Sequence, residues 1–136
     1  MVHVQFLRFS TNQEKLIRIC QLVTDHFNKK EKIILFAPNE EVAKYVDLLL
    51  WRLPEDGFLP HLYSDKPSNN FIQITTLQEN LNQASFCLNL CPGIGIIMKE
   101  FTVIYDILDG THESKFQLSQ RRQQEYVKQH LTCHVI

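Results

Sequence analysis

The sequence predicts a three-layer α/β sandwich, in which helices cover both faces of a mostly parallel sheet of about five strands. Three observations lead to this prediction. Strand-like apolar segments alternate with helix-like amphipathic ones, one segment is apolar throughout, and most strands are separated by enough chain to cross over the sheet. A chain of 136 residues fits one domain, 1–136, with a single core.

The first strand and the first helix are predicted from the opening of the chain. Apolar residues recur with a half-alternating pattern over 2–9, which is typical of a strand. Thr11 and Glu14 have the spacing of a capping box, so a helix is expected to begin near Asn12. Its apolar residues fall on one face: Leu16, Ile19, Cys20, Val23 and Phe27.

The second strand and the second helix follow directly. Residues 33–37 form a continuous apolar run of strand length, which predicts a central strand buried on both faces. Asn39 is a good N-cap with two glutamates after it, so a helix is predicted from there to Trp51, and Pro54 ends it.

The second half of the chain is predicted to supply the remaining strands and a last helix. Strands are expected at 71–75, 86–90 and 101–108, with a short turn or helix before the last of them. The last helix is expected to begin around Ser114 and to fray near His130. Because parallel neighbours need long connections, this order predicts an open, Rossmann-like sheet.

Composition excludes several classes of function. Fourteen basic and fifteen acidic side chains leave a net charge of -1, so no strong direct binding to DNA is expected. The apolar runs are too short to span a membrane. Four cysteines without a secretory leader indicate reduced thiols, so we expect a cytoplasmic protein.

Signatures of catalysis and of nucleotide binding are weak. The first strand-to-helix turn, 8–13, contains no glycine and no phosphate loop, and no G-x-S-x-G elbow occurs, so no cofactor is predicted. One cluster at the end of the fifth predicted strand resembles a catalytic site, although its Asp-Gly pair is more simply a turn. Its residues are Asp106, Asp109, Gly110, His112 and Glu113. This cluster keeps open the alternative of a small α/β nucleotide-binding protein or hydrolase.

Cysteines and histidines also allow a zinc site to be drawn. Cys87 and Cys91 are four positions apart, and Cys133 lies near His130 and His134. Ligands of structural zinc usually sit in pairs on tight turns, whereas Cys87 lies in the middle of a predicted strand. We therefore predict buried thiols and no metal site.

The segment 47–61 is the most informative part of the chain. An apolar helix ends in the only tryptophan, Trp51, and a turn leads to a second aromatic residue, Phe58, which Pro60 stiffens. This pattern predicts an exposed aromatic ridge that docks a partner. The alternative is that both rings close the core under a loop. His61 is interpreted as an orienting hydrogen-bond partner in preference to a general base.

Several blocks of the sequence together resemble a known family. In chain order they are Asp47-x-x-Leu50-Trp51, Phe58-Leu59-Pro60-His61, Leu88-Asn89-Leu90 with Pro92, a further strand, and an arginine-bearing last helix. Their order and spacing resemble the chi subunit of bacterial DNA polymerase III over most of the chain.

The resemblance implies a non-catalytic subunit that takes part in DNA replication. Such a subunit joins the clamp-loader complex, through a second small subunit called psi, to the single-strand DNA-binding protein. In that family the tryptophan segment belongs to the surface used by psi or by a competing repair helicase. The residues implied for this surface are Leu50, Trp51, Phe58, Pro60 and His61.

The resemblance implies a second surface on the last helix. In the family, basic and aromatic residues there receive the acidic, aromatic-ended C-terminal tail of the single-strand DNA-binding protein. The matching residues here are Arg121, Arg122, Tyr126 and Lys128, but glutamines occupy several expected positions. A solvated helix face is the alternative for this surface.

Overall fold

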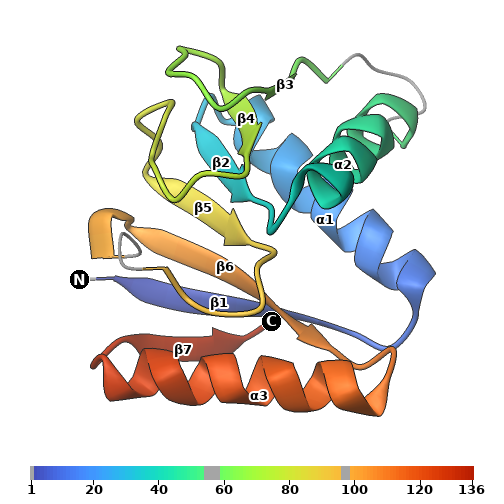
Figure 1. The fold of residues 1–136 in the computed structure, drawn as a ribbon, viewed down its shortest axis with the longest axis vertical. Helices are drawn as coiled ribbons and strands as arrows, with labels where there is room; N and C mark the ends of the chain where they lie inside the picture. Colours follow the sequence, from blue (N-terminus) through green and yellow to red (C-terminus); the bar gives the residue numbers. More distant parts are fainter. Residues whose placement is uncertain (1, 54–58, 96–98) are drawn as a thin grey trace.

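A computed structural model describes residues 2–53, 59–95 and 99–136 (Figure 1). The described residues form one seven-stranded sheet in the order β3-β4-β2-β5-β6-β1-β7, with every pair of neighbours parallel. The elements in chain order are β1 (His3–Phe9), α1 (Asn12–Asn28), β2 (Ile33–Phe36), α2 (Glu40–Arg52), β3 (Leu62–Tyr63), β4 (Ile72–Thr75), β5 (Phe86–Asn89), β6 (Val103–Asp109), α3 (Glu113–Lys128) and β7 (Thr132–Val135).

The predicted fold class is confirmed, and the sheet is larger than predicted. The additional strands are β3 and β7, which form the two edges of the sheet. Each is short, and neither carries the alternation of apolar and polar residues that identified the inner strands. None of the described helices is long and apolar enough to cross a membrane.

Local signals place the first two helices as the sequence predicts. The Thr11 hydroxyl accepts a hydrogen bond from the Glu14 N–H and so caps α1. The Asn39 side chain accepts from the Val42 N–H and caps α2 in the same way. Each cap satisfies a backbone donor that the first helical turn would otherwise leave unpaired.

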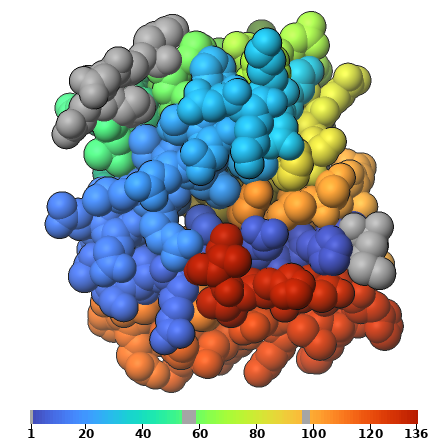
Figure 2. Space-filling view, turned by 180° about the vertical axis from the view of Figure 1, so that it is seen from behind, coloured from blue at the N-terminus to red at the C-terminus, as the bar shows by residue number. Residues whose placement is uncertain are grey.

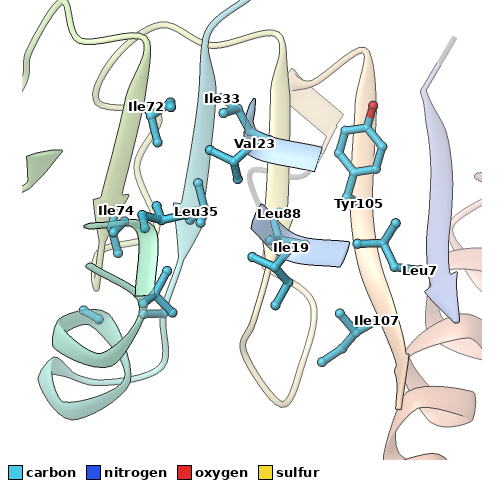
Figure 3. Close-up of a cluster of buried hydrophobic side chains, with 14 of the residues drawn as sticks. Leu7, Ile19, Val23, Ile33, Leu35, Ile72, Ile74, Leu88, Tyr105 and Ile107 are labelled. Carbon is cyan, nitrogen blue, oxygen red and sulfur yellow. The ribbon is translucent and has the colours of Figure 1, made fainter. Parts of the chain in front are cut away.

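Helices cover the two faces of the sheet with separate sets of apolar residues. On one face, Ile19 and Val23 of α1 belong to one core cluster with side chains of β1, β2, β4, β5 and β6 (Figure 3). Helix α2 packs on the same face, against β3 and β4. On the other face α3 packs against β6 and β7, and the ring of Tyr126 meets that of Phe6. The inner strand β2, which pairs with β4 and β5, is buried at every position, as its continuous apolar run predicts.

Candidate partner-binding surfaces

The ring of Trp51 lies on the outer side of α2, near the end of that helix. Its residue is 49% exposed, which is far more than a core tryptophan would be. One side of the indole rests on the imidazole of His61, with the ring centroids 4.5 Å apart. The indole therefore has a fixed support in His61 and keeps a large exposed surface.

His61 is held in place by backbone oxygens. Its Nδ1 lies 2.7 Å from the Leu59 carbonyl oxygen, and its Nε2 lies 3.0 Å from the Asp47 carbonyl oxygen. The Asp47 carboxylate is a further neighbour, 3.2 Å from Nε2, and the His61 side chain is fully buried. With both ring nitrogens engaged, this imidazole positions Trp51 and the chain around Pro60, which is half-buried.

Leu50 and Phe58 are the two other predicted members of this surface. Leu50 is 1% exposed and belongs to the core cluster, so its prediction as a surface residue is wrong. The reason is helical periodicity, since Leu50 follows Val46 on the inward face of α2. Phe58 lies outside the described residues.

Two exposed residues of α2 were missed by the sequence reasoning. Tyr45 is 55% exposed and Leu48 is 45% exposed. Together with Trp51 they occupy every third position of the helix, so they form one band along its outer side. We call these three residues, Tyr45, Leu48 and Trp51, the α2 stripe. The spacing is visible in the sequence, but Tyr45 and Leu48 were not among the residues predicted for the partner surface.

The last helix differs most from the prediction. Arg122 is 6% exposed and Tyr126 is fully buried, so their prediction as tail-binding residues is wrong. Both point into the domain, where they meet Asp106 in the middle of β6. Arg122 Nε lies 3.0 Å from one carboxylate oxygen of Asp106, and the Tyr126 hydroxyl donates to the other over 2.7 Å.

The carboxylate of Asp106 has further partners. The Asn89 side-chain amide donates to it over 3.2 Å and the Ile107 N–H over 2.7 Å. Burial raises the pKa of the Asp106 carboxyl, and the Arg122 guanidinium, the Tyr126 hydroxyl and the Ile107 N–H oppose that rise. Burial and the neighbouring carboxylate also raise the pKa of Tyr126, so its hydroxyl keeps its proton. This cluster fixes α3 onto the sheet.

Arg121 and Lys128 are the predicted tail-binding residues that reach the surface. They are seven positions apart, so they lie on the same side of α3 about two helical turns from each other. Beside them a shallow hollow of about 490 Å³ runs along the helix. It is lined by Gln120, Gln123, Gln124, Val127 and Lys128.

The residues of the strand-end cluster around Asp109 are engaged in local structural contacts. Asp109 pairs with Lys15 over 3.1 Å and accepts a hydrogen bond from the Thr111 N–H. Burial acts to raise the pKa of Asp109, but the hydrogen bonds from Thr111 and Lys15 lower it overall. His112 caps α3 and contacts Ser114. Asp106 has a separate role under α3, where its carboxylate contacts Arg122 and Tyr126.

The cysteines and histidines from which a zinc site could be drawn include Cys87. Cys87 is buried in β5, where burial raises the pKa of its thiol well above the ordinary value. Across residues 2–53, 59–95 and 99–136, no group of three or more histidine, cysteine, aspartate or glutamate side chains is placed to hold a metal ion.

These features define a small α/β domain with an apolar and aromatic stripe on one outer helix. The family model described as DNA polymerase III chi subunit, HolC, matches residues 1–134. The chain therefore belongs to the DNA polymerase III chi subunit family, which gives it an accessory role in DNA replication. The comparison with curated proteins gives no match.

Proposed function

We propose that the chain is a non-catalytic adaptor that links the clamp-loader complex, through psi or a repair helicase, to the acidic tail of the single-strand DNA-binding protein. The observation that supports this proposal best is the α2 stripe around Trp51. Membership of the chi family supports the replication context. The two contacts use different helices, α2 for psi or the helicase and α3 for the tail.

The α2 stripe has the properties of a binding hot spot. Tryptophan and tyrosine bury much area at a small cost in side-chain entropy, and both are enriched at the centres of interfaces. His61 already holds the indole in place, so little further ordering is needed when a partner binds. Leu48 adds aliphatic area between the two rings.

The α3 contact rests on fewer charges than the family pattern implies. Arg121 and Lys128 are available to pair with acidic side chains of the tail, and Gln124 lies between them. Glutamine amides donate hydrogen bonds without adding charge. We therefore propose a weak tail contact that is partly electrostatic.

Co-purification with psi or with the helicase tests the first contact. Trp51→Ala is expected to weaken the association about 30-fold, because loss of a central aromatic anchor typically costs about 2 kcal/mol. Phe71→Ala is the matched control, since Phe71 is an aromatic residue that is 38% exposed, lies just before β4 and is not part of the stripe. Association that survives in the Trp51 variant would remove the stripe from the interface.

Titration with a labelled peptide tests the second contact. The peptide ends in acidic residues, proline and phenylalanine, and is titrated at two salt concentrations. Its affinity is expected to fall at the higher salt and in the double variant Arg121→Ala/Lys128→Ala, because exposed charge pairs are screened. Lys66→Ala, which alters an exposed lysine between β3 and β4, serves as the control. An affinity that neither salt nor the double variant changes would contradict the proposed tail site.

A further inference from the structure

One edge of the sheet is formed by β7, which pairs only with β1 among the described residues. Thr132, His134 and Val135 are all exposed, and Val135 is 46% exposed. In Figure 2 the dark red residues at the end of the chain lie at the surface of the molecule. The outer side of this strand is therefore open to another chain.

The hydrogen bonds to β1 fix which backbone groups of this edge point outward. The Ile136 N–H donates to the Phe6 carbonyl, and the Ile136 carbonyl accepts from the Arg8 N–H. In a parallel strand both polar groups of a residue point to the same side, and the side alternates along the chain. His134 thus also faces β1, whereas the N–H and C=O groups of Cys133 and Val135 face outward. No partner for these outward groups lies within the part of the chain that the structure describes.

We propose that β7 pairs with β7 of a second copy of this chain, antiparallel, about a twofold axis that passes beside His134. Cys133 of one copy then faces Val135 of the other, and each residue of such a pair gives its N–H and accepts with its C=O. His134 faces His134 as a pair without backbone hydrogen bonds. The two sheets join into one continuous sheet, and the β7 edge of each copy is closed.

The composition of the edge favours an identical partner. Proteins protect open edges with lysine, proline or bulges, and Thr132–Val135 contains no charged residue and no proline. Two identical uncharged strands meet without repulsion, and an isologous contact of this kind closes as a dimer. The side chains of Val135 and of Ile136, which is 48% exposed, would bury apolar surface in the same step.

The neighbouring helix leaves room for this arrangement. Helix α3 contacts β6 and β7, the two strands on either side of β1, so it lies above β1. In the proposed dimer the two α3 helices are then separated by about three strand spacings, about 14 Å, which exceeds a helix diameter of about 10–12 Å. Successive residues of a helix are turned by about 100°, so the glutamines and Val127 that line the hollow lie on a different side of α3 from Arg122. We place this side toward β7. Uncharged side chains of both copies thus meet across the axis, with Lys128 as the charged member of that lining.

Disulfide trapping tests the register. In His134→Cys the two new cysteines face each other with Cα atoms about 4.5 Å apart, which is within the range of a disulfide. We expect a covalent dimer under mild oxidation, on a gel without reductant. Thr132→Cys is the matched control, because position 132 faces position 136 of the other copy and so has no cysteine opposite. Equal cross-linking of the two variants would overturn the proposed pairing.

Sedimentation equilibrium tests the association itself. The unmodified chain is expected to form a dimer in a concentration-dependent way. Val135→Pro removes an outward N–H but leaves the hydrogen bonds to β1, so it is expected to weaken the dimer at least tenfold. Val135→Ala keeps that N–H, so the dimer is expected to persist. Melting temperatures confirm that both variants fold. A chain that stays monomeric up to about 1 mM would overturn the proposal. This holds also if the edge then proves to accept a strand of another protein.

Discussion

Arg122 and Asp106 form an ion pair that is closed off from water. Asp106 is fully buried and Arg122 is 6% exposed, and the guanidinium also reaches the Ile107 carbonyl oxygen and the Ser119 hydroxyl. A buried pair of this kind contributes little compared with an apolar pair of the same shape, but the loss of one partner is costly. Its main effect is to fix the rotation of α3 on the sheet.

The first prediction concerns this pair. Arg122→Ala should lower the free energy of unfolding by about 3–5 kcal/mol, because it leaves the carboxylate of Asp106 buried without its cation. Urea denaturation measures the change. Arg121→Ala, at the neighbouring exposed position, should stay within about 0.5 kcal/mol of the unmodified chain. Equal effects of the two substitutions would show that Arg122 is not in the buried pair.

The second prediction concerns His26, which lies on the buried side of α1 near its C-terminal end. Its Nε2 is 2.8 Å from the Tyr105 hydroxyl, and its ring packs at a tilt against that of Phe86, with the centroids 4.4 Å apart. Burial lowers the pKa of this imidazole, and the Glu31 carboxylate opposes that change. As the pH falls, His26 of the unfolded chain takes up a proton near its ordinary pKa of about 6.5, whereas His26 of the folded chain takes it up only at a lower pH.

Stability should consequently fall as the pH drops from about 7 to about 5. His26→Gln should flatten this part of the curve, whereas His134→Gln, at an exposed position, should leave it as it is. Chemical denaturation at a series of pH values provides the measurement. If the dependence of stability on pH is unchanged in His26→Gln, other groups cause it.

The connection between β6 and α3 depends on a close approach of two backbone segments. Gly110 donates its N–H to the Phe9 carbonyl oxygen over 3.0 Å. A Cβ atom at Gly110 would stand 2.7 Å from the same oxygen, which is a clash with backbone. The turn that brings α3 back onto the sheet therefore requires glycine at this position.

The third prediction follows from this geometry. Gly110→Ala should cost about 1–3 kcal/mol of unfolding free energy, because backbone atoms must shift to admit the methyl group. Gly93→Ala is the matched control, since a Cβ atom there meets nothing within 4 Å. Thermal denaturation compares the two variants. Similar melting temperatures would mean that the turn accommodates the methyl group.

Helices and inner strands were predictable because their signals are local. The caps at Thr11 and Asn39 and the apolar run of β2 each specify an element without knowledge of the rest of the chain. Edge strands are different, because β3 and β7 exist only through pairing with a neighbour that is distant in sequence. Their residues carry no periodic pattern that distinguishes them from loops.

The two proposed surfaces lie at opposite ends of the sheet. Helix α2 packs against β3 and β4, and α3 packs against β6 and β7, with β2 and β5 between them. Figure 1 shows the two helices far apart along the longest axis of the molecule. An adaptor that holds two partners at once needs this separation.

The fourth prediction is that the two contacts are independent. Trp51→Ala should leave the affinity for the acidic peptide unchanged, and Arg121→Ala/Lys128→Ala should leave association with psi or the helicase unchanged. Changes at well-separated sites usually add within about 0.5 kcal/mol. Binding measurements on the single and combined variants test this, and a coupling above about 1 kcal/mol would contradict it.

The candidate site was only partly predictable from the sequence. Trp51 was assigned to the surface because its helix ends in a turn, and the structure exposes it. Arg122 and Tyr126 were assigned wrongly, because α3 is polar on most sides and its apolar periodicity does not reveal which side faces inward. Their partner, Asp106, lies on β6 and is identified only when the tertiary contacts are known.

The position of β1 inside the sheet has a consequence for synthesis of the chain. Through His3 this strand pairs with Val103 on one side and Thr132 on the other. The ribosome therefore releases the first strand long before either neighbour exists. During that interval its apolar residues Val4, Phe6, Leu7 and Phe9 stay unprotected, so the nascent polypeptide is expected to engage a chaperone until the final strands emerge.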